Sequence, residues 1–324
     1  MKQKKEKIVF LDEGTLKYGG VDFSCIEELG YYDSYKRTES NEISERILSA
    51  NHIIVNKCVL NEKIIQKHAG HIKAIHVTAT GVNNIDLNAA RKHGIAVTNV
   101  KGYSTESVVQ FTVGFILALS HHLVDYQRVI SNGDWQKSPF FSCASYPVTE
   151  VAGKTLVILG YGTIGKRVAQ VARALKMDVL VCKIPGKKYL STTDAKRISL
   201  REGLVRADFF TIHTPLSVLT NNLIGDKEIK WMKKKAFLIN MARGGIVNEK
   251  AWATALNKKI IAGGATDVLS VEPPSHKNPL LKAKNLLMTP HIAWASFEAR
   301  GRLIKEVALN IKAFQNSRVR NRIV

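Results

Sequence analysis

Cysteine is scarce in this sequence, with only four among 324 residues. No two of them form a CxxC pair, and the histidines form no cluster with the spacing of metal ligands. These absences argue against a disulfide-stapled fold and against a bound metal, and they favour the reducing cytoplasm as the protein's location. The four residues are Cys25, Cys58, Cys143 and Cys182.

Long hydrophobic runs are also absent, and no segment approaches the roughly 20 apolar residues of a transmembrane helix. The apolar run that ends at Leu11 is too short for a secretory signal and predicts a first strand. With 45% hydrophobic and 23% charged residues, the composition is that of a soluble globular protein. The length favours two domains.

Acidic residues are scarce as well. The sequence has 27 Asp and Glu but 48 Lys and Arg, which gives a formal net charge of +21. Such a charge can indicate binding to nucleic acid or to an anionic membrane. Here the lysines are spread along the chain, and no helix-turn-helix, zinc or RNA-binding motif accompanies them. We therefore expect neither partner, although the field will attract anionic ligands.

The order of predicted elements indicates an α/β fold. In the first hundred residues, short β-branched runs alternate with segments of helical period, and a second such series begins after Lys154. Between the two series, residues 104–123 predict a buried helix with Ser107 and Gln110 as a capping box. The tail from Ser296 predicts an amphipathic helix. The sequence therefore predicts two doubly wound parallel sheets.

The stretch GYGTIG places Gly160, Gly162 and Gly165 in G-x-G-x-x-G register, with Thr163 and Ile164 between them. It follows an apolar strand and opens a helix, which is the context that gives this pattern its meaning. The first glycine makes the turn, the second lets the backbone approach a pyrophosphate, and the third lets the helix pack on the strand. These residues predict a dinucleotide-binding site.

Three later loops carry side chains suited to catalysis. Arg243 follows one predicted strand, Asp267 and Glu272 follow the next, and His291 follows Pro290 after the last. Because ligands bind at the carboxyl ends of strands in an open parallel sheet, we expect these loops to gather near the glycine turn.

Taken together, these motifs resemble the D-isomer-specific 2-hydroxyacid dehydrogenase family, and within it the glycerate dehydrogenases, also called hydroxypyruvate reductases. The resemblance implies a Rossmann dinucleotide-binding domain of residues 102–294 inserted into a flavodoxin-like substrate domain of residues 1–101 and 295–324. It also implies a homodimer built through the cofactor domain. The motifs that carry it are TGVNNID, GYSTESVVQ, GYGTIG, HTPL, NMARGGIVNE, DVLSVEPP and TPHIAWA.

The expected chemistry is reversible hydride transfer between a nicotinamide and a small 2-keto acid. Histidine suits proton transfer because its ordinary pKa lies near neutral pH, so His291 is the predicted proton donor and Glu272 the residue that orients it. Arg243 suits the substrate carboxylate because its guanidinium is planar and permanently charged. The family's matching loop implies that the backbone at Thr80 and Gly81 completes the carboxylate site.

The remaining site residues come from the same resemblance. Trp294 is expected to wall the substrate pocket, with core packing as the alternative. Asp267 is expected to accept a hydrogen bond from the nicotinamide carboxamide. The residues expected to line the cofactor are Thr214, Pro215, Met241 and Ala242.

Lys183 stands where an NAD-binding domain carries the acid that binds the adenosine ribose. Asp178 lies too early, and the next acid is Asp194. An acid would repel a 2′-phosphate, whereas Lys183, with Lys187 or Lys188, would attract one. The sequence therefore favours NADP(H) over NAD(H). The alternative is that these lysines contact no cofactor and merely belong to a solvated turn of a lysine-rich protein.

Other functions remain open at this level. The same fold occurs in transcriptional corepressors that resemble these dehydrogenases. A binding module that senses dinucleotides is therefore an alternative to an enzyme. Among enzymes, hydroxypyruvate with D-glycerate is the expected pair, and glyoxylate with glycolate is close to it. D-lactate dehydrogenase and phosphoglycerate dehydrogenase are further alternatives.

Overall fold

The computed structural model describes residues 5–189 and 196–324. The chain divides into two compact units, one of Met1–Ser104 with Trp294–Val324 and the other of Thr105–Ala293. The second unit thus starts three residues later than the sequence suggested and ends one residue earlier. Trp294 belongs to the discontinuous first unit.

The first unit is built on a five-stranded, fully parallel sheet in the order β2-β1-β3-β4-β5. This is the flavodoxin-like order, in which the chain changes direction across the sheet between β1 and β3. The predicted fold class is confirmed for this unit. The strands are β1 (Lys7–Phe10), β2 (Tyr31–Ser34), β3 (His52–Val55), β4 (Ala74–Val77) and β5 (Ala96–Thr98).

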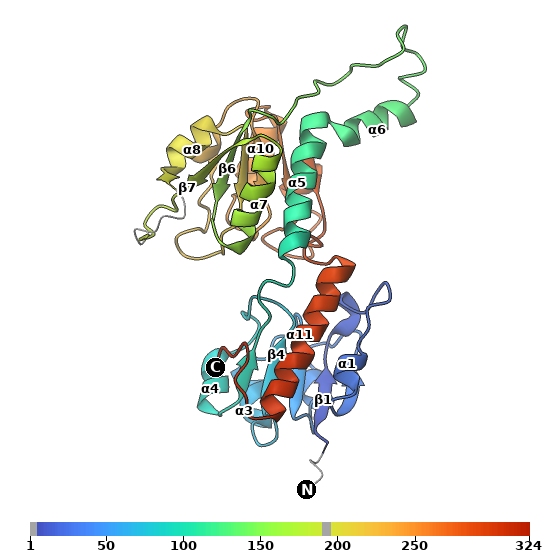
Figure 1. Cartoon of the computed structure of the whole chain (residues 1–324), viewed down its shortest axis with the longest axis vertical. Coiled ribbons are helices and arrows are strands. Elements are labelled where there is room, and N and C mark those ends of the chain that lie inside the picture. The colour runs from blue at the N-terminus through green and yellow to red at the C-terminus, as the bar shows by residue number, and fades with distance from the viewer. Residues whose placement is uncertain (1–4, 190–195) are drawn as a thin grey trace. The chain divides into compact units, whose positions relative to one another are not determined.

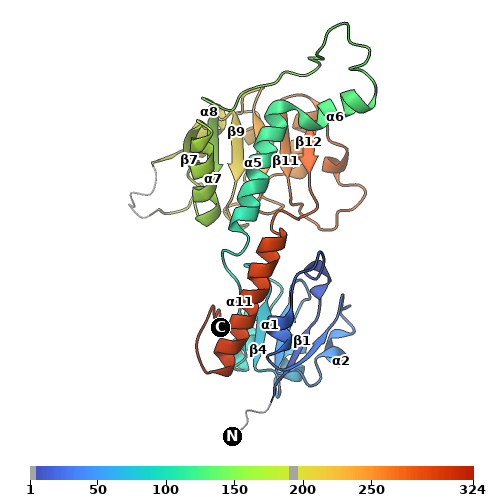
Figure 2. The same ribbon diagram turned by 45° about the vertical axis from the view of Figure 1, so that its right-hand side comes forward.

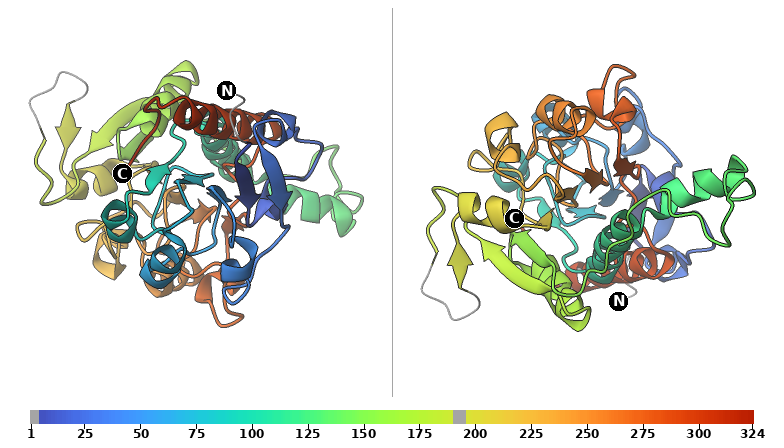
Figure 3. Two further views of the ribbon diagram at one scale, coloured as in Figure 1. Left: turned by 90° about the horizontal axis from the view of Figure 1, so that it is seen from below. Right: turned by 90° about the horizontal axis from the view of Figure 1, so that it is seen from above.

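Helices cover both faces of this sheet because alternate strand residues are apolar on each side. The predicted C-terminal helix α11 lies across one face together with α1 (Figure 1 and Figure 3). Leu303, Ile304 and Val307 of α11 are fully buried there. The bounds are α1 (Ser24–Glu27), α2 (Ile43–Arg46), α3 (Glu62–His68), α4 (Leu87–Lys92) and α11 (Phe297–Gln315), with a 3-10 turn at Glu13–Thr15.

The second unit is built on a seven-stranded parallel sheet in the order β12-β11-β10-β9-β6-β7-β8. From β6 the chain first runs outward through β7 and β8, and then returns to add β9 on the other side. The Rossmann switch point therefore lies between β6 and β9. The strands are β6 (Thr155–Leu159), β7 (Asp178–Cys182), β8 (Arg197–Ile198), β9 (Phe209–Ile212), β10 (Phe237–Asn240), β11 (Gly263–Thr266) and β12 (Leu286–Met288).

Figure 2 shows helices α5 and α7 in front of this sheet, and helices α8, α9 and α10 pack on the opposite face. The predicted capping box at the start of α5 is wrong. Ser107 lies inside the helix, where its hydroxyl donates to Ala293 O at 2.5 Å. The bounds are α5 (Thr105–His121), α6 (Leu123–Ser131), α7 (Thr163–Ala174), α8 (Leu200–Arg206), α9 (Asp226–Ile229) and α10 (Glu249–Asn257), with a 3-10 turn at Pro279–Lys282.

After α6, residues 132–150 form an arm without helix or strand that projects from this unit (Figure 1). The Tyr126 hydroxyl of α6 holds the returning part of this arm by donating to Tyr146 O at 2.7 Å. In the described part of the chain, no helix taken singly has the length and apolar character needed to cross a membrane. Only α5 and α6 taken as a pair, with a bend of 55° between them, meet the criteria of length and composition.

Candidate active site

The glycine turn lies at the carboxyl end of β6, at the switch point of the Rossmann sheet. Gly160 has φ +102°, and a Cβ there would lie 2.5 Å from the carbonyl carbon of His213. A Cβ on Gly165 would lie 2.1 Å from Gly160 O. Both positions therefore require glycine for reasons within the chain itself.

Gly162 is different, because a Cβ there would meet no atom of the chain within 4 Å. It is the N-cap of α7 and has no side chain that could accept from the first-turn N–H groups. These N–H groups are therefore suited to bind an anionic group beyond the helix end. An open pocket of about 620 Å³ adjoins it, within the size range of cofactor sites. Thr163, which begins α7, also lines this pocket, and Ile164 follows it. These residues fit a dinucleotide pyrophosphate.

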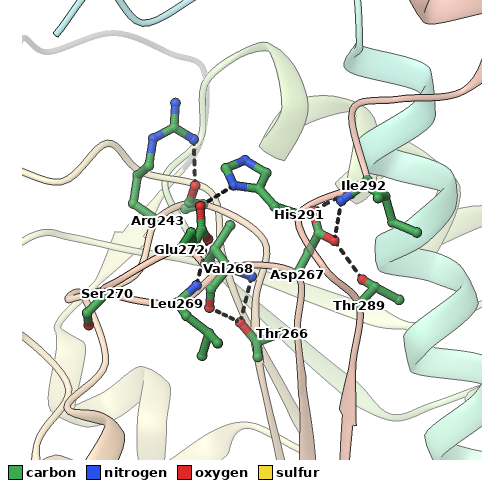
Figure 4. A network of polar contacts seen from close by, with 12 residues as sticks. Arg243, Thr266, Asp267, Val268, Leu269, Ser270, Glu272, Thr289, His291 and Ile292 are labelled. Atoms are coloured by element: carbon green, nitrogen blue, oxygen red, sulfur yellow. Dashed lines mark hydrogen bonds and ion pairs between the residues drawn. The ribbon is translucent and has the colours of Figure 1, made fainter. Parts of the chain in front are cut away.

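His291 and Glu272 come together as predicted from the sequence. His291 Nδ1 lies 2.5 Å from Glu272 Oε2 (Figure 4), and Leu269 N donates to Glu272 Oε1 at 2.8 Å. The loop after β11 thus holds the carboxylate while the segment after β12 supplies the imidazole. Because Nδ1 is engaged by Glu272, Nε2 is the ring nitrogen suited to exchange a proton with a ligand.

Arg243 belongs to the same group of side chains (Figure 4). Its loop follows β10 and is held by Asn240, whose side chain donates to Arg243 O at 2.9 Å and accepts from Ala242 N at 3.1 Å. The guanidinium is exposed and donates to Ala242 O at 2.7 Å. The permanently charged guanidinium therefore lies on a fixed loop, where it could bind the carboxylate of a ligand.

Asp267 is 3% exposed, and burial raises its pKa above the ordinary value of an aspartate. Its carboxylate accepts hydrogen bonds from three donors of the segment around His291, namely Thr289 Oγ1, Ile292 N and Ala293 N. The nicotinamide carboxamide, which was its expected partner, would have to share an oxygen that the chain already uses.

The other expected cofactor residues follow strand ends at the same edge of the sheet. Thr214 and Met241 are buried, and Pro215 O accepts from the Thr220 hydroxyl at 2.8 Å. His213, directly after β9, is partly buried, and burial lowers its imidazole pKa to about 3. Its Nδ1 has no hydrogen-bond partner among the described residues.

Lys183 follows the last residue of β7, as predicted, and its side chain is exposed. The turn that follows brings Lys187 back, since Lys187 N donates to Ile184 O at 3.1 Å. Lys187 and Lys188 are exposed as well. Asp194 lies outside the described residues.

Thr80, Gly81 and Trp294 belong to the first unit. Thr80 and Gly81 follow β4, and neither of their amide N–H groups donates a hydrogen bond within the ranges that the structure describes. Trp294 is half-buried, with its ring centroid 6.3 Å from that of Tyr103 in a T-shaped contact. This contact supports the packing alternative for Trp294.

Two hydroxyl residues whose roles could not be predicted from the sequence take part in this arrangement. The Thr289 hydroxyl donates from the segment that carries His291 to Asp267, and the Ser107 hydroxyl donates to Ala293 O of the same segment. Thr289 stood in the TPHIAWA motif, but nothing in the sequence indicated that its hydroxyl turns toward Asp267. Ser107 was misassigned because its partner is 186 residues away along the chain.

Comparison with known proteins agrees with this geometry. Residues 113–293 match the family described as D-isomer specific 2-hydroxyacid dehydrogenase, NAD binding domain. The chain is 37% identical over 322 residues to a glycerate dehydrogenase of Methylorubrum extorquens, covering 98% of each. It is 35% identical to a hydroxypyruvate reductase of Blautia hydrogenotrophica, covering 95% of this chain and 96% of the other.

Among solved structures, a D-lactate dehydrogenase from Aquifex aeolicus complexed with NAD and lactic acid superimposes with a TM-score of 0.79 at 27% identity. The match covers 96% of each chain. The resemblance noted from the motifs is confirmed, and these relatives are enzymes, so the alternative of a sensing module is not favoured. The chain is an oxidoreductase of the D-isomer specific 2-hydroxyacid dehydrogenase family.

Proposed function

We propose that this chain catalyses reversible hydride transfer between a nicotinamide dinucleotide and a small D-2-hydroxy acid or 2-keto acid, with hydroxypyruvate and D-glycerate as the principal pair. The observation that carries the proposal is the His291–Glu272 pair at 2.5 Å, in the unit that matches the NAD-binding family. The names glycerate dehydrogenase and hydroxypyruvate reductase on relatives of nearly full coverage support the choice of substrate. Glyoxylate is proposed as a second substrate, because other relatives are named glyoxylate reductase.

His291 is the proposed acid and base. Reduction of the keto group leaves an alkoxide oxygen that needs a proton within hydrogen-bond reach. His291 Nε2 supplies it, because Glu272 engages Nδ1 and leaves Nε2 as the ring nitrogen for the transfer. The bound nicotinamide contributes only the hydride.

Substrate orientation is assigned to charge and to backbone donors. Arg243 binds the substrate carboxylate with its guanidinium and polarises the carbonyl. The N–H groups of Thr80 and Gly81 are a second set of proposed carboxylate donors, supported by their lack of partners in the described chain. Trp294 is proposed to limit the size of the substrate's side group.

The cofactor is proposed to bind at the glycine turn through Gly160, Gly162, Thr163, Ile164 and Gly165. The open position at Gly162 supports this placement. Further contacts are assigned to Thr214, Pro215, Met241, Ala242 and Asp267, which follow strand ends at that edge.

We further propose NADP(H) over NAD(H). Exposed Lys183, with Lys187 and Lys188 in the following turn, offers positive charge to a 2′-phosphate where an acid would repel it. Charge-assisted hydrogen bonds are worth about 1.5–3 kcal/mol, which is enough for a tenfold or larger preference.

The protein is proposed to act in the cytoplasm as a homodimer. Its four cysteines are free thiols, which suits a reducing compartment. The arm after α6 exposes Phe140, Phe141 and Trp135, with Phe141 93% exposed. Aromatic groups left open in this way suit burial against a second copy of the chain.

A steady-state panel tests the reaction. Hydroxypyruvate, glyoxylate, pyruvate and phosphohydroxypyruvate are each assayed with NADH and with NADPH, and hydroxypyruvate is expected to give the highest kcat/KM. His291→Gln is expected to lower kcat by roughly a thousandfold or more while the cofactor still binds, since general acid catalysis supplies about that much. His276→Gln, at an exposed histidine of the same unit, is the matched control. Turnover by His291→Gln within tenfold of the parent would exclude this role for the histidine.

A further inference from the structure

One side chain ties down the chain on both sides of His291. Asp267 Oδ1 accepts from Thr289 Oγ1 at 2.6 Å and from Ile292 N at 2.8 Å, and Oδ2 accepts from Ala293 N at 2.9 Å (Figure 4). The three donors span residues 289–293, with His291 in the middle. No rotation of the His291 segment can occur without breaking some of these bonds.

The His291 backbone needs such a restraint. Its φ is +55°, in the left-handed region that residues with a Cβ rarely adopt. A residue remains in that conformation only where the surrounding structure over-determines it. Before His291, Thr289 N donates to Thr266 O at 3.0 Å. After it, the amides of Ile292 and Ala293 both donate to the Asp267 carboxylate.

We infer that Asp267 is a positioning residue, which keeps the left-handed turn at His291 and so holds its imidazole on Glu272. The inference rests on the proposed role of His291 as the proton donor. It differs from the carboxamide role proposed for Asp267, because the bonds to residues 289–293 exist without any cofactor. A carboxylate has about four acceptor positions, and the chain itself takes three of them.

The site requires a carboxylate in particular. Three donors converge on Asp267, so an amide nitrogen in place of either oxygen would face a donor and leave it unsatisfied. The side chain is 3% exposed, and its burial disfavours the charged form. The hydrogen bonds from Thr289, Ile292 and Ala293 oppose that effect. The carboxylate and its loop therefore stabilise each other.

Thr289→Val is the sharpest test, because it removes one of the three bonds and leaves the Asp267 carboxylate in place. We expect kcat for hydroxypyruvate to fall roughly tenfold, the loss expected for one charge-assisted bond, and the cofactor KM to stay within about twofold. Hydrogen–deuterium exchange of the peptide covering 289–293 is expected to accelerate roughly tenfold in the cofactor-free protein. A residue that served only the carboxamide would give neither change.

Two further variants test the same hydrogen bonds, one by keeping the hydroxyl and one by replacing the carboxylate. Thr289→Ser keeps the hydroxyl and is expected to restore both kcat and slow exchange. Asp267→Asn should lower kcat by roughly a hundredfold, since misplacement of a catalytic group by about 1 Å has that effect. Thr254→Val removes a comparable hydroxyl bond to Lys250 O on α10 and is the matched control.

The outcomes separate this inference from the reaction on which it rests. Parent-like kcat and exchange in Thr289→Val would overturn the positioning role. If the parent protein turns over none of the 2-keto acids, the proposed function fails, and the exchange rates alone decide whether Asp267 restrains the turn. Faster exchange in Thr289→Val with rescue by Thr289→Ser supports the restraint in either case.

Discussion

At the scale of single residues, Lys183 is the side chain that we expect to select between the two dinucleotides. The structure places it directly after β7, with its side chain exposed and Lys187 and Lys188 in the turn that follows. Asp178 begins the same strand and is separated from this end by its whole length. A positive group therefore occupies the position from which an acid would select NAD(H).

Lys183→Asp should reverse the preference. We expect the ratio of kcat/KM for NADPH to that for NADH to fall by roughly tenfold or more, because a charge-assisted bond is lost and a repulsive carboxylate is added. The ratio comes from initial rates with each cofactor at saturating hydroxypyruvate. Lys258→Asp makes the same charge change at the exposed lysine that follows α10 and should alter both values equally. A parent enzyme that prefers NADH would itself contradict the proposal.

The pairing of His291 with Glu272 could be predicted, because both follow predicted strand ends and such ends share one edge of a parallel sheet. The bonds that restrain His291 could not. Thr289 and Ser107 are common residues whose hydroxyls adapt to whatever acceptor the tertiary fold presents. Nothing local in the sequence indicates a left-handed backbone at His291, since only the tertiary contacts sustain it.

At the scale of elements, the turn from β6 into α7 combines two kinds of glycine. A Cβ at Gly165 would clash with Gly160 O, so that glycine serves the packing of helix on strand. A Cβ at Gly162 would meet nothing in the chain, and its φ of −87° suits any residue. The chain itself therefore does not require glycine at 162, and we expect this glycine to serve the close approach of the dinucleotide.

Alanine at the two positions should separate folding from binding. Gly165→Ala is expected to destabilise the protein by about 1–3 kcal/mol, the usual effect of overpacking, and to lower its melting temperature. Gly162→Ala is expected to keep the parent melting temperature without cofactor and to lose at least tenfold in NADPH affinity. Thermal unfolding and a fluorescence titration measure the two effects. Equal destabilisation by both variants would contradict the division.

Most strands could be predicted because buried parallel strands are continuous apolar runs. Two edge strands, β2 and β8, have no such run. β2 has the sequence YYDS, in which no residue is buried, and β8 has two residues. Edge strands have one neighbour, so their sequences carry little of the hydrophobic signal that identifies a strand.

At the scale of the whole molecule, the arm after α6 exposes large aromatic side chains. Phe140 and Phe141 are 74% and 93% exposed, and Trp135 is half exposed. The stacking of His122 on Tyr146 and the hydrogen bond from Tyr126 hold the returning part of the arm against α6. An arm fixed at its base, with open aromatic rings beyond it, suits an interface in which a second copy covers those rings.

Phe141→Asp should therefore weaken the proposed homodimer. Burying a carboxylate among apolar groups costs free energy, and losing an aromatic anchor costs about 2 kcal/mol, so we expect the dimer Kd to rise by roughly 30-fold or more. Sedimentation velocity over a range of concentrations measures the change. Val319→Asp makes the same kind of change at a residue 78% exposed in the first unit and should leave the dimer intact. A monomeric parent, or a Phe141→Asp dimer of unaltered Kd, would show that the arm has another purpose.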